Sequence, residues 1–528
     1  MKTLHKSYIF SFLCSIAIVT VGHAQVAEDA LLISRTAPTG TARMLGLGGG
    51  GVSLGGDLSS AYINPAGLGF YNRSQVVLSP HFKNAKTNSN FLNSTSETFD
   101  NQFNISNFGI VFNNTKDDIV PADYRGGSFA ISYNQTNTYN ISYGFGGENA
   151  FSLLDEFALQ ANGIDVAVFD QSIDDETYPF YPDAAYANYL INPYPDNSTS
   201  YAASIPPGAT AVQEGLIEEQ GRQSEWDFSY GGNYKDKLYF GASIGFKNFT
   251  YEKNTSFSEQ YVYPEEFRQG GSNYPFKPFD DSPLTIESVD NVRLDETLNI
   301  DGSGVNASIG LIYRPVNELT IGLAYKTPTI YSMTEEYSFV LNSQTVGIRE
   351  EVDSEPQTFN QPVVGTVNFS EYTLSTPSKV SGGFSYFFQK YGFITADVEY
   401  MNYAANRFGS NEFNTGTLNT EIDEVMKSVI NYKLGGEFRY DMFRLRLGYA
   451  LYADPTRYAG DQLDRDRVVL SGGVGFHTPT FFADLAVVNT QYNTDFFPYQ
   501  GAQNFPTADI PNSEDNITNV VLSVGFNF

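Results

Sequence analysis

The sequence has very little cysteine, histidine and tryptophan. Its 528 residues include one cysteine, four histidines and one tryptophan, and Cys14 lies in an N-terminal segment that we expect to be removed. A secreted chain without cysteine has no disulfide bonds to stabilise it. Outside that segment only His81 and His477 remain, which is too few for a typical zinc or haem site. We therefore expect no metal and no cofactor.

Basic residues and long apolar runs are also scarce. The chain has 31 Lys and Arg against 60 Asp and Glu, a formal net charge of -29. It therefore lacks the basic footprint that nucleic acid requires. After Val21 no apolar run reaches the about 20 residues of a spanning helix, so any membrane crossing must be made of strands.

Residues 1–24 have the pattern of a secretory signal peptide. Lys2 and Lys6 precede an apolar run, Ile9–Val21, which ends in Gly22-His23-Ala24. A basic start, a short apolar centre and a small-x-small end are typical of such signals. Because the segment carries two lysines and no acidic residue, its removal shifts the net charge from -29 to -31. We expect export, and acidic extracellular loops that bridge to lipopolysaccharide through divalent cations.

What the sequence does have is alternation. Aromatic residues make up 15% of the chain and charged residues only 17%, which fits neither a disordered nor a helical protein. Leu238, Phe240, Ala242, Ile244 and Phe246 alternate with small or polar residues, and the C-terminal residues from 520 to 528 do the same. This period indicates strands with two unlike faces.

Short and long connections between these strands also alternate. Six are short and seven are long, which makes thirteen connections and fourteen strands. The expected long loops are 84–101, 147–223, 253–296, 342–376, 406–430, 453–465 and 493–516. Outer-membrane barrels have short periplasmic turns and long extracellular loops. The pattern therefore predicts an all-β, fourteen-stranded antiparallel transmembrane β-barrel over residues 75–528, in which Phe528 pairs back to the first strand near 75–83. The alternative is a large soluble all-β protein, which also has two-faced strands.

Residues 25–74 precede the barrel and are rich in glycine. This segment holds Gly46–Gly51 and the run Asn64-Pro65-Ala66-Gly67-Leu68. Dense glycine suits a compact plug inside a lumen better than a lipid-facing strand. Gly46, Gly48 and Gly51 formally match a dinucleotide fingerprint, but no parallel-strand unit surrounds them and no acidic residue follows about 20 positions on. We therefore reject that interpretation.

Gly46–Gly69, which ends in the Asn-Pro-Ala-Gly-Leu motif, resembles the plug of the long-chain fatty-acid transporter (FadL-type) outer-membrane family. The stretches 312–326, 374–377 and 445–449 are similar to that family in the expected order. Together these stretches cover the plug and most of the barrel, whereas the loops do not match. The resemblance implies a fourteen-stranded barrel with a blocked lumen. It also implies passive transport of hydrophobic compounds such as long-chain fatty acids or aromatic hydrocarbons.

The long loops contain candidate ligand-capture residues and helices. The aromatic candidates for capture are Tyr178, Phe180, Tyr181, Tyr194, Phe496 and Phe497. The alternative is ordinary packing of these proline-rich loops on themselves. We expect short helices at 152–161, where Ser152 and Asp155 fit a capping pattern, and at 421–430.

The third strand has polar residues where apolar ones are expected. Tyr133 and Tyr139 share one phase, so Gln135 and Asn137 between them should also face outward. Polar side chains are unfavourable in mid-bilayer. In the resembled family a lateral gap involves a break in this strand, so we place a candidate gap at Asn134, Gln135 and Asn137. The alternative is that this stretch stands above the bilayer.

Two functions from different classes follow from the sequence. The first is a diffusion channel, which a continuous apolar tunnel from the loops to the plug would favour. The second is a protein-binding barrel, as a secretion component or a surface adhesin, which a sealed lumen under flat loops would favour. No catalytic triad has a recognisable spacing, so we expect no catalytic residues and no enzyme. We expect a monomer that contacts outer-membrane lipid and a small hydrophobic molecule.

Overall fold

The computed structural model describes residues 27–35, 37–92, 94–116, 122–265, 268–269, 272–273, 286–349, 355–457, 464–495 and 512–528. The expected signal peptide, residues 1–24, lies outside them. Among the described residues, no helix has the length and hydropathy that a membrane-spanning helix needs.

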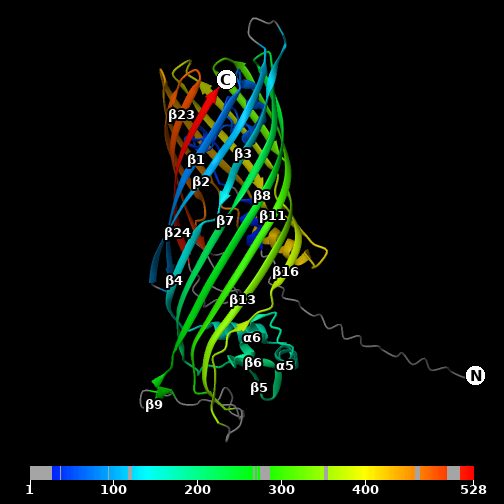
Figure 1. Ribbon diagram of the computed structural model, residues 1–528, viewed down its shortest axis with the longest axis vertical. Coiled ribbons are helices and arrows are strands. Elements are labelled where there is room, and N and C mark those ends of the chain that lie inside the picture. The colour runs from blue at the N-terminus through cyan, green and yellow to red at the C-terminus, as the bar shows by residue number, and fades with distance from the viewer. Residues whose placement is uncertain are drawn as a thin grey trace, which may run out of the picture.

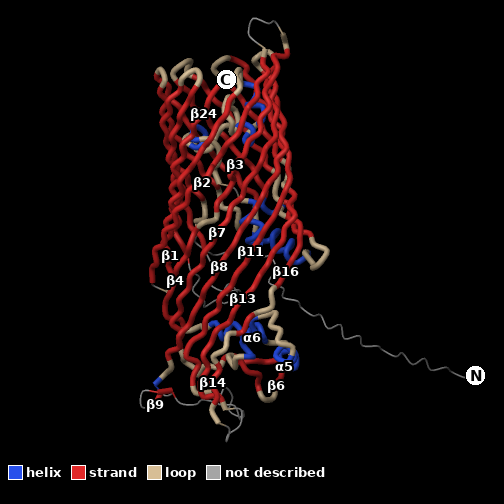
Figure 2. The backbone as a smooth tube through the Cα atoms, in the orientation of Figure 1, coloured by secondary structure: helices blue, strands red, loops and turns tan. Residues whose placement is uncertain are grey.

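The strands form one closed barrel of 14 antiparallel strands (Figures 1 and 2). Three of the fourteen are interrupted and carry two labels each. The strands of the wall are β1 Gln75–Phe91, β2 Ser94–Thr115, β3 Tyr124–Thr138 with β4 Ile141–Asn149, β7 Thr210–Tyr234, β8 Leu238–Val262, β11 Ser288–Val316, β12 Leu319–Lys326 with β13 Ile330–Ile348, β16 Asn368–Ser375 with β17 Lys379–Phe387, β18 Gly392–Asn402, β20 Ser428–Tyr440, β21 Phe443–Tyr452, β22 Arg467–His477, β23 Phe481–Asp495 and β24 Asn512–Asn527. Short strands lie at β9 Arg268–Gln269, β10 Ser272–Asn273, β14 Gln357–Phe359, β15 Val363–Val364 and β19 Arg407–Gly409.

The barrel closes as the sequence predicted. β24 pairs with β1 from Asn527 opposite Gln75 onward. Ser74 and Phe528 also exchange backbone hydrogen bonds, with N···O distances of 3.1 and 2.9 Å. Closure pairs the first strand with the last, so no sheet edge is left facing lipid, where its N–H and C=O groups would find no partners.

The wall has an apolar outer face near the short turns. In β8, Phe240, Ile244 and Phe246 are 41%, 52% and 52% exposed, whereas Tyr239 and Ser243, in the opposite phase, are buried. The predicted alternation is thus confirmed, and its apolar face points away from the lumen. This is the expected surface for contact with lipid.

Toward the long-loop end the lumen-facing side chains of the strands become apolar and the outward-facing ones become polar. Beyond Phe246, the lumen-facing side chains of β8 become aromatic, with Phe249 and Phe257 fully buried, while Asn248 and Asn254 occupy the outer phase. The strands therefore continue past the lipid-facing zone. For this reason the predicted loop 84–101 is wrong: β1 and β2 run on to a turn at Leu92. The loops at 147–223, 253–296 and 342–376 are shorter than predicted, and the loop predicted at 406–430 is displaced to 403–427.

Residues 150–209, between β4 and β7, fold into a compact cap at the long-loop end of the barrel. It comprises α4 Leu153–Ala161, α5 Val166–Asp174, α6 Tyr181–Ala187, β5 Ile191–Tyr194 and β6 Asn197–Ala203. The capping box between Ser152 and Asp155 is present, which confirms the first predicted helix. The second prediction is wrong in its bounds. There, α7 spans Gly416–Val425 and Ser428 already belongs to β20, because that stretch pairs with β18.

The cap contains a carboxyl group that makes its stability depend on pH. Glu156 in α4 is 3% exposed and its Oε2 has no partner among the described residues. Burial raises the pKa of this carboxyl from 4.5 to about 7, although a hydrogen bond from Gln160 opposes the shift. A carboxyl that holds its proton more tightly when folded stabilises the cap fully below its unfolded pKa. That stabilisation is lost as the pH rises through the folded value.

We therefore expect proteolytic resistance of the cap to fall between about pH 4.5 and 7 in the wild type. Glu156→Gln should remove this fall, because the amide stays neutral. Limited proteolysis across that range measures it. Asp165→Asn is the matched control, since Asp165 is exposed and asparagine also caps helices well. If the proteolytic resistance of Glu156→Gln fell with pH as that of the wild type does, a group other than Glu156 would cause the fall.

The N-terminal residues lie inside the barrel. They form α1 Ala27–Ser34, α2 Ala42–Leu45, α3 Ser60–Ile63 and the 3-10 helix η1 Pro65–Phe70, and we call residues 27–74 the plug. η1 contacts β7, β8 and β11 on one side of the lumen, and α2 contacts β22, β23 and β24 on the other. The plug therefore spans the lumen between opposite walls.

Candidate functional site

Asn64 anchors the plug both to itself and to the wall. Its side chain is fully buried, its Oδ1 accepts from Ala66 N at 3.1 Å, and its Nδ2 donates to Val52 O at 2.6 Å. The same Nδ2 lies 3.5 Å from the carbonyl oxygens of Leu311 and Leu323 in the wall. The Asn-Pro-Ala-Gly-Leu motif therefore starts η1 and locks it against β11 and β12.

Glycines in the wall let the plug backbone lie flat against the strands. A Cβ added to Gly241 in β8 would lie 2.3 Å from the carbonyl carbon of Pro65, and one at Gly448 would lie 2.1 Å from Gly48 N. On the opposite wall, the Asp397 carboxylate accepts from the N–H groups of Gly51 and Val52 at 2.6 and 3.1 Å. The plug is thus held by backbone contacts.

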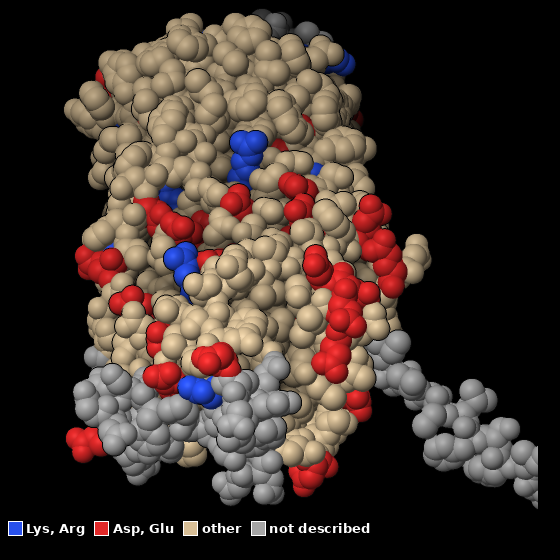
Figure 3. Space-filling view, turned by 60° about the horizontal axis from the view of Figure 1, so that its bottom comes forward, with Lys and Arg blue, Asp and Glu red and all other residues tan. Residues whose placement is uncertain are grey.

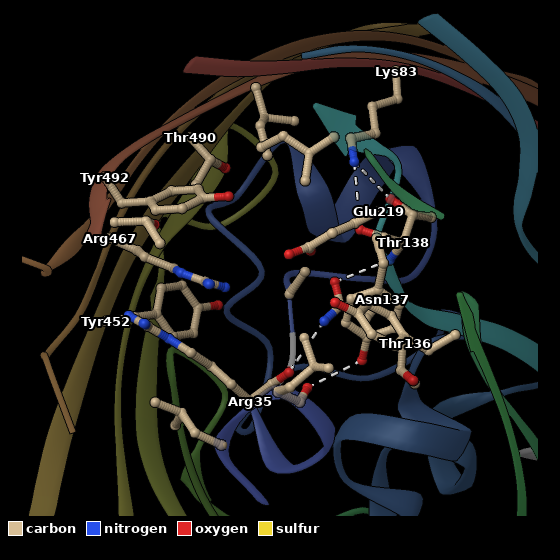
Figure 4. A pocket seen from close by; sticks show the side chains of 18 of the residues that line it. Arg35, Lys83, Thr136, Asn137, Thr138, Glu219, Tyr452, Arg467, Thr490 and Tyr492 are labelled. Carbon is tan, nitrogen blue, oxygen red and sulfur yellow. Dashed lines mark hydrogen bonds between the residues drawn. The ribbon is translucent and has the colours of Figure 1, made fainter. Parts of the chain in front are cut away.

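A cavity of about 500 Å³ lies between the plug and the wall (Figure 4). Much of its apolar lining comes from the plug and from β22, β23 and β24, and β4 and β11 contribute Ile141 and Leu298. The residues from the plug and β22–β24 include Leu31, Leu32, Val469, Val488, Ile517 and Val521. Across the cavity lie Thr136, Asn137 and Thr138 (Figure 4).

Two arginines from different elements give this cavity a positive site. Figure 4 shows Arg35 of the plug and Arg467 of β22 beside Tyr452 and Tyr492. Burial, and then the neighbouring charge of Arg467, lower the pKa of the Arg35 guanidinium to about 9, so it stays protonated at neutral pH. Arg35 Nη2 donates to the Arg465 carbonyl oxygen at 3.2 Å, and in the described part of the chain the buried Nε of Arg467 has no hydrogen-bond partner. Carboxylates such as Glu28, Asp29 and Glu219 also line the cavity, so the positive charge is local to the two arginines, and it is there that an anionic group would fit.

The barrel wall is interrupted beside this cavity. The ladder between β2 and β3 runs from Thr115 opposite Gly126 to Asn107 opposite Asn134 and stops there. Among the described strands no ladder joins β2 to β4, which pairs with β7 instead. We call the interruption between β2 and residues 135–140 the wall break. The wall closes again beyond it, where Ser142 Oγ donates to Asp100.

The outward orientation predicted for Gln135 and Asn137 is wrong. Thr136 is an extra residue in a β-bulge, because Gln135 pairs with Ser224 and Asn137 with Gln223. The bulge and the break shift the phase, so Tyr139 faces the lumen and its hydroxyl donates to Leu32 O at 3.1 Å. Asn137 Nδ2 donates to Arg35 O at 3.2 Å, and Gln135 is 6% exposed.

Asn134 also points into the lumen. Its Nδ2 donates to Asp227 at 2.9 Å, and its Oδ1 accepts from Asn107 at 2.6 Å. Asn134 therefore ties the last ladder pair below the break to β2 and β7. The three residues proposed from the sequence do adjoin an interruption of the wall, but they line it from inside.

Lys83 in β1 satisfies the carbonyl groups that the break exposes. Its ammonium donates to Thr138 O and Asn140 O at 3.4 and 3.0 Å, and to Thr138 Oγ1 at 3.1 Å. These groups belong to the residues between β3 and β4. A single cation thus replaces the ladder hydrogen bonds that a continuous strand would make.

Lys83→Met is expected to loosen the wall break, because the Thr138 and Asn140 carbonyls lose their donor. Hydrogen-exchange mass spectrometry should show at least tenfold faster exchange in the segment 136–143, as expected for about 1–3 kcal/mol per unsatisfied group. Lys86→Met is the control, since Lys86 lies in the same strand and pairs with Glu97 at 2.5 Å. Equal exchange in both variants would show that Lys83 does not hold the break.

Solved structures resemble this fold. A Pseudomonas aeruginosa FadL homologue superposes with a TM-score of 0.54 over 93% of this chain and 99% of that chain, at 13% sequence identity. The chain has the fold of the FadL-type barrels. The P. putida toluene transporter TodX follows with a TM-score of 0.49, at 12% identity over 93% of this chain and 99% of that one. No family model and no curated protein matches the sequence.

The loop aromatics of this FadL-type barrel lie in different environments. Tyr181 is 2% exposed and bonds through its hydroxyl to Glu296 and Tyr337, so it belongs to the packed interior of the cap. Tyr178 packs against the same cluster, and Phe180 is the residue before α6. Tyr194 is 43% exposed. Phe496 and Phe497 lie outside the described residues.

The sequence pattern does not mark the basic residues of the FadL-type lumen as functional. Arg35, Lys83 and Arg467 are isolated basic residues far apart in the chain, and no local motif marks them. Only their lumen-facing phase offered a signal, and for Lys83 that phase follows from its neighbours: Phe82 is 45% exposed whereas Lys83 is 3% exposed.

Proposed function

We propose that this protein is a passive channel of a bacterial outer membrane for small hydrophobic compounds. The observation that carries the proposal is the cavity of about 500 Å³, which joins apolar side chains to a break in the wall. Burial of apolar surface, worth about 25 cal/mol per Å², supplies the driving force for entry. No energy source is needed when the compound moves down its gradient.

Within this class, long-chain fatty acids fit better than aromatic hydrocarbons. A fatty acid has a carboxylate, and Arg35 and Arg467 both line the cavity, where the Nε of Arg467 has no partner among the described residues. Guanidinium groups bind carboxylates through strong charge-assisted hydrogen bonds. The apolar lining from Leu31, Val488 and Val521 would hold the chain.

The proposed route runs from the long loops to the wall break. A compound enters the cavity beside the plug and leaves sideways between β2 and the segment at Asn134, Gln135 and Asn137. The plug must shift during this passage, because its backbone contacts span the lumen. Tyr194 is exposed at the loop end and is a candidate for first capture.

The surroundings follow from the same proposal. Asp and Glu side chains are spread over the long-loop end (Figure 3), where divalent cations would bridge them to lipopolysaccharide. We propose a monomer that is exported by its signal peptide, since the closed ring already pairs its first and last strands. A sealed lumen under flat exposed loops would favour the competing protein-binding role, whereas the cavity beside the wall break favours the channel.

Uptake by proteoliposomes tests the channel directly. Liposomes with the purified barrel should take up a fluorescent long-chain fatty acid faster than liposomes without protein. Mass spectrometry of apolar molecules that co-purify with the folded barrel gives a second measurement. Equal uptake with and without protein, together with no co-purified apolar molecule, would exclude the channel.

A further inference from the structure

The wall break is surrounded by buried polar atoms without partners. In the described part of the chain, six side chains around it each have one such atom. They are His81 Nδ1, Gln102 Oε1, Asn104 Nδ2, Asn107 Oδ1, Gln135 Oε1 and Asn140 Oδ1, which we call the port cluster. Most buried polar atoms in folded proteins have a partner, so six around one interruption indicate a site that receives polar groups from outside the chain.

The members of the port cluster come together from three neighbouring strands. His81 in β1 lies opposite Asn104 in β2. Asn107 lies opposite Asn134, next to Gln135, at the end of the β2–β3 ladder. His81 and Gln135 are 8% and 6% exposed, and both line the cavity. The cluster therefore connects the cavity with the wall break.

The chemistry of the cluster selects for hydrogen-bond donors. Four of its six free atoms are amide oxygens, which accept but do not donate. A carboxylate has no hydrogen to donate to these oxygens, whereas a hydroxyl group would donate to one of them and accept from Asn104 Nδ2. A fully apolar chain would leave all of these atoms unsatisfied.

The rim of the break is apolar, in contrast to the port cluster. On β2, Ile105 and Phe103 are 40% and 72% exposed. Just below the break, Phe108, Tyr133 and Trp226 form an aromatic cluster with ring centroids 5.0 to 5.5 Å apart. Aromatic clusters of this kind sit at membrane–water interfaces. A molecule that crosses the break thus meets apolar contacts and hydrogen-bonding groups together.

We infer that the wall break is a binding site for hydroxyl groups, and that the preferred substrates are hydroxylated amphiphiles. Such a substrate has an anionic end for the arginines, an apolar chain for the cavity and a hydroxyl group for the port cluster. The inference rests on the proposed channel function and names its substrate class more closely.

Titration calorimetry in detergent tests this inference, with stearic acid and its mid-chain hydroxy derivative as probes. The wild type should bind the hydroxy acid roughly tenfold more tightly, which corresponds to about 1.4 kcal/mol. In Gln135→Leu and Asn104→Leu the ratio of the two affinities should fall to about one. Ser343→Ala is the control, because Ser343 Oγ is also buried without a partner among the described residues but lies in β13, away from the break; its ratio should stay that of the wild type.

The wild-type comparison does not depend on any variant. Equal affinities of the wild type for both acids would overturn the inference and leave the channel standing. If the wild type bound neither acid, both the channel for fatty acids and the port would be excluded. A ratio that falls equally in Ser343→Ala would show that the preference does not arise at the port cluster.

Discussion

Gly241→Ala is expected to unseat the plug and to turn a closed barrel into an ion-conducting one. The new Cβ would lie 2.3 Å from the Pro65 carbonyl carbon and 2.5 Å from Ala66 N. Backbone atoms cannot rotate away as a side chain can, and overpacking of this kind costs about 1–3 kcal/mol. The wall is held by its ladder, so the plug should yield first. Single-channel recording in planar bilayers should show open pores for the variant and a closed baseline for the wild type.

The matched control is Gly382→Ala in β17. There the added Cβ would have its nearest neighbour, Gly322 O, at 4.0 Å, so the plug should stay seated. Folding of both variants is checked by the shift in gel mobility on heating. A folded Gly241→Ala barrel with wild-type conductance would show that the close approach of η1 to the wall does not seat the plug.

Arg467→Gln is expected to weaken the binding of a long-chain carboxylate by about 10- to 150-fold. This range corresponds to the about 1.5–3 kcal/mol of a hydrogen bond to a charged group. The effect should be this large because Arg467 lines the cavity and its buried Nε has no hydrogen-bond partner among the described residues. Binding of toluene should change little, since it carries no charge. Titration with stearic acid and toluene measures both.

Arg293→Gln is the control for charge alone. Arg293 lies in β11 with 57% of its side chain exposed and pairs with Asp295 at 2.9 Å, so its loss should leave stearic acid binding unchanged. An Arg467→Gln barrel that binds stearic acid as the wild type does would exclude Arg467 from the site. A loss of toluene binding of the same size would indicate damage to the cavity instead.

Particular residues show which features of the fold the sequence predicts and which it does not. The alternation from Leu238 to Phe246 predicted both the strand and its lipid-facing side, because a closed barrel in lipid imposes that period. The alternation does not predict the strands where β1 and β2 extend beyond the bilayer, because lipid no longer constrains the outer face there. The Asn-Pro-Ala-Gly-Leu motif marked the plug, although its role as an anchor became visible only in the contacts of Asn64.

The sequence by itself determined a fourteen-stranded barrel with a glycine-rich plug, because lipid outside and a ladder of local pairings constrain residues that are close in the chain. Only the tertiary structure decided the site. The bulge at Thr136 reversed the predicted orientation of its neighbours, and Arg35 meets Arg467 across more than four hundred residues. Such meetings depend on how the plug is seated in the closed ring. No period or local motif encodes them, since each residue contributes one isolated side chain from a distant strand.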